Sequence, residues 1–122
     1  MPKYLFLISE AEAPYAAPDP DATLFAEVMA MHDEFSAAVT EAGAEILGGE
    51  ALQPSATATY LRGTRTDAVT AIDNPTPDLK EVFGGYYVIE AADDAQALEL
   101  AKLCPAPHGY IEIRPVWEFD QG

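Results

Sequence analysis

The segment of residues 71–90, AIDNPTPDLKEVFGGYYVIE, restricts the fold of this chain more than any other stretch. Pro75 and Pro77 remove two backbone donors and hold the residues before them extended, so residues 73–78 can form neither a helix nor a central strand. We therefore expect a rigid, exposed loop that leads directly into a strongly β-forming run. Loops held by a scaffold in this way often carry binding groups.

Length and composition indicate one globular domain over residues 1–122. Charged residues make up 22% of the chain and hydrophobic residues 49%, the balance of an ordinary folded domain. The formal net charge of −15 repels phosphate backbones and anionic lipid, so we expect neither a nucleic-acid partner nor a membrane partner. The acidity itself is typical of a highly soluble or salt-adapted surface.

Several classes of site are disfavoured by what the sequence lacks. Cys104 is the only cysteine, so no disulfide can form within the chain, and no apolar run approaches the roughly 20 residues of a membrane span. The first residues do not resemble a secretory signal, and we expect a cytoplasmic location. His32 and His108 are far apart, which argues against a metal site, and Gly84-Gly85 lacks the Lys-Ser/Thr of a phosphate loop. We expect no cofactor.

The first half of the chain predicts a strand, a long helix and a second strand. Residues 4–8 are continuously apolar, which is typical of a strand buried on both faces. Asp19-Pro20 is a helix-start signal, and Gly43 is a stop signal. A strand over residues 45–52 is weakened at its middle by two glycines. The apolar stripe of the helix contains Leu24, Val28, Met31, Phe35, Val39 and Ala42.

The second half predicts a hairpin, a strand, a short helix and a last strand. Residues 56–61 and 68–72 alternate as hairpin strands, and residues 85–90 form a strand that is apolar on both faces. Asp93 and Gln96 have the spacing of a capping box, which opens a helix. The expected inward residues of that helix are Leu98, Ala101 and Leu103, and those of the final strand, 110–119, are Ile111, Ile113, Trp117 and Phe119.

This order of elements, β-α-β-hairpin-β-α-β, fits a ferredoxin-like α+β fold with an inserted β-hairpin. Two helices can cover only one face of such a sheet. Because two of the expected strands are apolar on both faces, the other face needs a cover that the chain does not encode. We therefore predict a homodimer that packs sheet against sheet.

The candidate functional side chains lie on the long helix and around the proline-rich loop. His32, at the edge of the apolar stripe, is either a general base or a buried structural histidine. Asp73 is a candidate acid–base group and Lys80 an anchor for an anionic substrate group, and the alternative is a salt-bridged loop. His108 is a second candidate base, although an exposed loop histidine is the simpler interpretation. The predicted substrate-binding set is Asp78, Lys80, Glu81 and Tyr86.

The loop and the strand after it resemble the DGPF-x-E-x-KE…GGYY signature of the YCII-related (DGPF-domain) family. KYLFLIS at the start, GGEALQPSATAT in the middle and EIRPVWEF near the end extend the similarity over almost the whole chain. Asn74 and Thr76 differ from the family, which usually has Gly and Phe there. The positions that carry the signature here are Asp73, Pro75, Asp78, Lys80, Glu81, Gly84, Gly85, Tyr86 and Tyr87.

The resemblance implies a dimeric α/β-barrel arrangement and leaves two functions open. One is a cofactor-independent enzyme that performs acid–base chemistry, of isomerase or lyase type, on a small organic substrate. The other is a non-enzymatic dimeric module that binds a small molecule or regulates, with a link to a sigma-factor pathway. In related proteins a histidine of this helix is paired with an aspartate near the helix end, but Gly43 occupies that place here.

Overall fold

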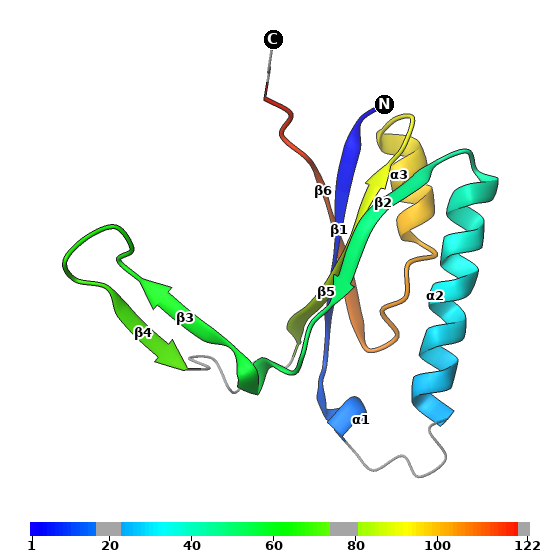
Figure 1. Ribbon diagram of the computed structural model, residues 1–122. Helices are drawn as coiled ribbons and strands as arrows, with labels where there is room; N and C mark the ends of the chain where they lie inside the picture. The colour runs from blue at the N-terminus through cyan, green and yellow to red at the C-terminus, as the bar shows by residue number, and fades with distance from the viewer. Residues whose placement is uncertain (17–22, 74–80, 120–122) are drawn as a thin grey trace.

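The computed structural model describes residues 1–16, 23–73 and 81–119 and contains a four-stranded antiparallel sheet (Figure 1). The strands lie in the order β2-β5-β1-β6. Their bounds are Lys3–Glu10 for β1, Glu45–Ala51 for β2, Val82–Glu90 for β5 and Gly109–Pro115 for β6. In chain order, the first and third strands of this sheet are β1 and β5, and both are central. The mixed α+β arrangement is therefore compatible with the predicted ferredoxin-like fold.

Helices cover one face of the sheet. In Figure 1, α2 (Thr23–Glu41) and α3 (Asp94–Ala101) lie on the same side of the strands, and the single-turn α1 (Ala13–Ala16) follows β1. The most deeply buried side chains of the layer between sheet and helices are Phe6, Phe35, Val39 and Ile89. Burying each stabilises the fold by roughly 1.5–3 kcal/mol, which fixes how α2 sits on the sheet.

Helix α2 matches the predicted helix, but two residues of its predicted inward row are exposed: Met31, and Ala42, which follows the last helical residue, Glu41. Phe35 and Val39 are buried, whereas Met31 is 38% exposed. His32 is half-buried and takes the inward place expected for Met31, because the inward row runs from the half-buried Val28 with a spacing of four to His32 and then of three to Phe35. Gly43 ends the helix with a φ of 78°, as predicted. The start signal Asp19-Pro20 lies outside the described residues.

The two central strands present different surfaces on their two faces. Tyr4, Phe6 and Ile8 of β1 are buried beneath the helices, while Leu5 and Leu7 are half-buried on the opposite face. Strand β5 begins at Val82, three residues earlier than predicted, because its ladder with β1 continues through a bulge after Ile8. We call the face away from the helices the open face.

Glycines let the edge strand β2 approach β5 closely. A Cβ on Gly85 would lie 3.0 Å from the Glu50 carbonyl oxygen. A Cβ on Gly49 would lie 2.6 Å from the Tyr86 carbonyl oxygen. The predicted weak point of β2 is present as a register shift between Ile46 and Gly48.

Strands β3 (Thr59–Arg62) and β4 (Thr70–Asp73) pair antiparallel in a sheet of their own, which projects away from the main body (Figure 1). We call residues 59–73 the arm. The strand predicted over residues 56–61 begins three residues too early, because Ser55–Thr57 forms a 3₁₀ turn in which the Thr57 hydroxyl donates to the Pro54 carbonyl. Gly63, with a φ of 76°, helps to reverse the chain at the tip of the arm.

The capping box of α3 is confirmed, but its predicted inward face is partly wrong. The Gln96 amide donates to Asp93 Oδ1 at 2.9 Å, and Gln96 Oε1 accepts from the Ala92 amide at 2.7 Å. Leu98 and Leu103 are exposed. The residues that α3 buries are Ala97, Leu100 and Ala101.

The last strand is shorter than predicted. Ile111 and Ile113 pack against the core as expected, but β6 ends at Pro115, and Trp117 and Phe119 are 80% and 68% exposed. Strand β6 ends there because its partner β1 has no residue before Lys3 with which to pair. The last hydrogen bond joins the Val116 amide to the Lys3 carbonyl. Trp117 and Phe119 stack on each other with ring centroids 5.5 Å apart.

Candidate functional site

A cavity of about 580 Å³ opens between the first half of α2 and the end of the sheet where β1 ends and β5 begins. This is the size range of small-molecule sites. Most of its wall is apolar, from both the helix and the chain after β2. The residues that matter for its chemistry are Phe25, Val28, Met29, Leu52 and Val82 on the apolar wall, and Glu10, Glu12, His32, Glu50, Tyr86 and Tyr87 among the polar ones.

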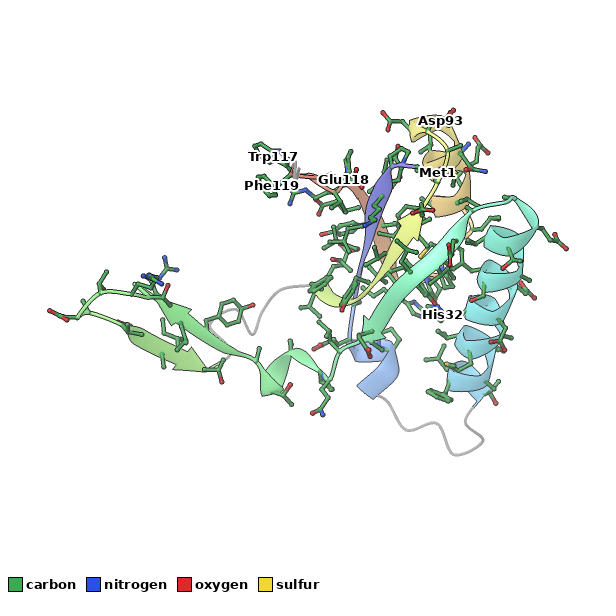
Figure 2. All side chains as sticks on the ribbon, turned by 45° about the horizontal axis from the view of Figure 1, so that its top comes forward. Met1, His32, Asp93, Trp117, Glu118 and Phe119 are labelled. Atoms are coloured by element: carbon green, nitrogen blue, oxygen red, sulfur yellow. The ribbon has the colours of Figure 1, made fainter. Side chains whose placement is uncertain are left out.

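A short polar contact in this cavity joins α2 to β5. His32 Nδ1 lies 2.6 Å from the Tyr87 hydroxyl oxygen. Both side chains are placed by the core, since His32 lies in the inward row of α2 and Tyr87 alternates with the buried Ile89 on β5. The Tyr87 ring also contacts the buried Phe35 ring, with centroids 5.0 Å apart. Figure 2 places His32 at the inner side of α2, toward the strands.

Burial decides the charge of this pair. It lowers the pKa of His32 below its usual 6.5, and the negative charges of Glu10 and Asp33 offset part of that effect. Burial also raises the pKa of Tyr87, with further contributions from Cys104 and Asp33. At neutral pH the pair is therefore an uncharged imidazole beside a protonated phenol.

The imidazole can relay a proton. Among the described residues, His32 Nε2 has no hydrogen-bond partner, while Nδ1 is held by Tyr87. In the tautomer with the proton on Nδ1, that nitrogen donates to the Tyr87 oxygen and leaves the Nε2 lone pair as a base. In the other tautomer Tyr87 donates to Nδ1, and Nε2–H is a donor. The arrangement therefore supports both proton uptake and proton return at Nε2.

Two glutamates organise the segment around the rim of the cavity. Glu12 accepts from both the Ser55 amide, at 2.6 Å, and the Ser55 hydroxyl, at 2.7 Å. This ties the chain after β1 to the 3₁₀ turn after β2. Glu10 Oε2 accepts from the His108 amide at 3.1 Å, which anchors the loop before β6. These contacts hold three sequence-distant segments at one end of the sheet.

The predicted site residues are only partly brought together by the described structure. His32 and Tyr86 both line the cavity, but Tyr86 pairs with Leu7, so its side chain lies on the open face of the sheet. Glu81, half-buried just before β5, is not among the lining residues. Asp73 has its backbone at the end of β4, opposite Thr59, and its side chain lies outside the described part. Asp78 and Lys80 fall outside the described residues.

Sequence reasoning missed two residues of the site, Tyr87 and Glu10. Tyr87 belongs to the GGYY signature and lies on the same strand face as Ile89. That position on the apolar face was the signal from which its place beneath α2 could have been predicted. Glu10 gave no such signal. Cys104 is not a candidate nucleophile, because burial and then Glu10 raise its thiol pKa to about 12.

Two further searches concern only the described residues. No group of three or more His, Cys, Asp or Glu side chains converges there in a way that could hold a metal ion. No helix in the described part combines the length and apolar character needed to cross a membrane.

Comparison with known proteins identifies a family but no characterised relative. No curated protein matches the sequence significantly. The family model of the YCII-related domain matches residues 3–120, which is nearly the entire chain. The match spans β1, which forms the cavity end with Glu10, as well as the His32 helix and the Tyr87 strand. The chain belongs to the YCII-related domain family.

Proposed function

We propose that this protein is a cofactor-independent acid–base enzyme, of isomerase or lyase type, which acts on a small organic substrate in the α2–β5 cavity. The observation that carries the proposal is the 2.6 Å contact between His32 Nδ1 and the Tyr87 hydroxyl in a largely apolar cavity of about 580 Å³. Histidines held by a second group, with the other nitrogen left available, are the usual general bases.

In the proposed reaction His32 Nε2 removes a proton from a carbon of the substrate and returns it to another position or to a leaving group. Tyr87 accepts the Nδ1–H bond and keeps the ring oriented while the imidazolium exists. Glu10 and Asp33 stabilise that positive charge, which offsets the cost of forming it in a half-buried site. The apolar wall, with Phe25 and Val28, excludes water from the substrate.

The residues of the proline-rich loop remain part of the proposal. Asp73 is proposed as a second acid–base group, and Asp78, Lys80, Glu81 and Tyr86 as substrate-binding residues. Tyr86 borders the cavity, although its side chain lies on the open face, opposite Leu7. For Asp78 and Lys80 the support is their position in the family signature next to β5.

Proton exchange tests the chemistry before the natural substrate is identified. Small carbonyl compounds in D₂O should exchange their acidic carbon-bound protons faster with the protein than without it, as followed by ¹H NMR. His32→Gln should slow this catalysed exchange by about 100-fold or more. Tyr87→Phe keeps the ring packing against Phe35 and should cause a smaller loss, about tenfold, because only the orienting hydroxyl is removed.

Tyr110→Phe is the matched control, since Tyr110 is an exposed tyrosine of β6 outside the cavity lining. It should exchange at the wild-type rate. If His32→Gln retained the full catalysed rate for compounds that bind, His32 would not be the base, and the enzyme proposal would fail.

A second candidate function is a non-enzymatic module that binds or regulates, including the sigma-factor link implied by the family resemblance. The neutral His32–Tyr87 pair favours it, because an uncharged pair in an apolar cavity can simply recognise a ligand by hydrogen bonds. A ligand that binds tightly, loses affinity in Tyr87→Phe and is never converted would establish this alternative.

We also propose a homodimer that packs through the open face. Leu5 and Leu7 of β1 and Tyr86 and Val88 of β5 remain half-buried there, on the side that α2 and α3 do not cover. A stable sheet-to-sheet interface would bury upward of about 1,200 Å² in total.

A further inference from the structure

Two exposed segments, the arm and the chain after β6, project on the same side of the sheet. In Figure 1 the arm and the C-terminal segment both extend away from the side occupied by α2, and Figure 2 shows Trp117, Glu118 and Phe119 on the side of the arm. We call residues 116–119 the tail. Both segments therefore border the open face.

Both segments expose large apolar side chains that the described part of the chain does not bury. Both strands of the arm leave large apolar side chains exposed, including Tyr60, Leu61 and Ile72. A two-stranded ribbon without a packed face is marginal in water. The tail exposes a stacked indole and phenyl ring, Trp117 and Phe119. Apolar surface of this kind on two projecting segments indicates an interface.

The arm and the tail leave the sheet at opposite ends. The arm follows Ala51 and precedes Val82, at the end where Glu10 pairs with Val82. The tail follows Pro115, which pairs with Tyr4 at the other end of β1. The two segments also lie at opposite edges of the sheet, because the arm connects β2 to β5 and the tail follows β6. A two-fold axis that runs diagonally across the open face exchanges both the ends and the edges, and so places each arm beside the tail of the other copy. An axis along the strands would instead leave both arms at the same end of the dimer.

Charge selects between these two arrangements. Arg62 and Arg65, two of only six basic residues, lie in the distal part of the arm, so arm against arm would gather four guanidinium groups. The tail carries Glu118 between its two aromatic residues. No ion pair within the described residues involves Arg62 or Glu118. For a chain of net charge −15, an arginine is also the side chain best suited to meet a second copy.

The two surfaces match in chemistry as well as in charge. The register of the arm places Tyr60, Arg62 and Ile72 on one face, since Tyr60 pairs with Ile72 and alternates with Arg62. An aromatic ring, an aliphatic chain and a guanidinium complement the indole, phenyl and carboxylate of the tail. Arginine stacks on aromatic faces and pairs with carboxylates at the same time.

We propose that a second copy of this chain covers the arm and the tail, with Tyr60, Arg62 and Ile72 of each arm packed on Trp117, Glu118 and Phe119 of the other protomer. This inference rests on the homodimer proposed above. It adds the direction of the two-fold axis and the contact between the arm of one protomer and the tail of the other. The contact forms twice in the dimer, so each substitution acts twice.

A charge exchange measured by sedimentation equilibrium tests the contact. Arg62→Glu and Glu118→Arg should each raise the dimer dissociation constant by about tenfold or more, and the double exchange should bring it back to within about threefold of the wild type. Lys102→Glu is the control, because it makes the same charge change at the exposed C-cap position of α3, on the helix side. It should leave the dissociation constant within about threefold of the wild type. Failure of the double exchange to restore association would overturn the contact.

Trp117 provides an independent readout, because it is the only tryptophan. Its emission should be blue-shifted and protected from acrylamide in the dimer, and should become exposed on dilution to the monomer or in Tyr60→Ala. A dimer in which Trp117 is quenched as freely as in an unfolded peptide would overturn the arm–tail contact while leaving the sheet-to-sheet dimer intact. Protection of Trp117 in a monomer would overturn it too, because the chain would then cover the tail itself.

Discussion

His32 is the residue on which the chemistry depends, and its protonation gives a direct prediction. Because burial outweighs the nearby carboxylates, NMR titration of the folded protein should give a His32 pKa below 6.5. The linked effect on stability has a definite sign: the contribution of the neutral ring is complete above pH 6.5 and is lost as the pH falls through the lowered pKa. The free energy of unfolding should therefore decrease more between pH 7 and pH 5 for wild type than for His32→Gln.

The same substitution assigns the signal, since the chain has only two histidines and His32→Gln removes one set of imidazole resonances. A His32 pKa at or above 6.5 would contradict the prediction and would mean that Glu10 or an undescribed acid controls the ring. The sequence alone identified His32 as a candidate, because a histidine next to an apolar stripe is visible in the helical period. It did not identify the partner, because Tyr87 is 55 positions away and only the packing of β5 under α2 brings it to His32.

At the scale of elements, the approach of β2 to β5 sets the position of Tyr87 and can be tested with neighbouring glycines. Gly49→Ala would place a Cβ 2.6 Å from the Tyr86 carbonyl oxygen and 2.9 Å from Tyr87 Cδ1, so the strand or the ring must move. We expect a loss of about 1–3 kcal/mol in the free energy of unfolding by denaturant, accompanied by a shift of the His32 imidazole signals.

Gly48→Ala is the matched control, because a Cβ there would have no neighbour within 4 Å. It should be neutral, or stabilising by up to about 1 kcal/mol through the reduced entropy of the unfolded chain. Equal effects of the two substitutions would show that β2 does not approach β5 as described.

The elements that the sequence predicted well are those with a strong local signal. The period of α2, the capping box of α3 and the alternation of β5 needed no tertiary information. Trp117 and Phe119 were assigned to the core face because they continue the alternation of Ile111 and Ile113. Alternation cannot reveal that β1 offers no further partner beyond Lys3, so the end of β6 depended on a contact between distant segments.

At the scale of the whole molecule, the sequence predicted an uncovered sheet face from the apolar residues on both sides of β1, and the helices do lie on one side only. The projection of the arm could not be predicted, because local pairing in β3 and β4 does not determine where a ribbon points. A monomer with this open face and net charge of −15 must balance apolar attraction against electrostatic repulsion when it associates.

That balance gives the last prediction, which concerns the open face itself. Wild type should be a dimer at micromolar concentration in sedimentation equilibrium, and Leu7→Glu should shift it toward a monomer of 13.1 kDa by raising the dissociation constant at least about 100-fold. The reason is that Leu7 lies on β1 between Tyr86 and Glu112, so a new carboxylate would be desolvated beside an existing one.

Leu98→Glu makes the same change at an exposed position of α3 and should leave the dimer intact. If wild type were monomeric at that concentration, or if Leu98→Glu dissociated it as strongly as Leu7→Glu, the open face would not be the interface, and the apolar residues of β1 and β5 would require a different cover.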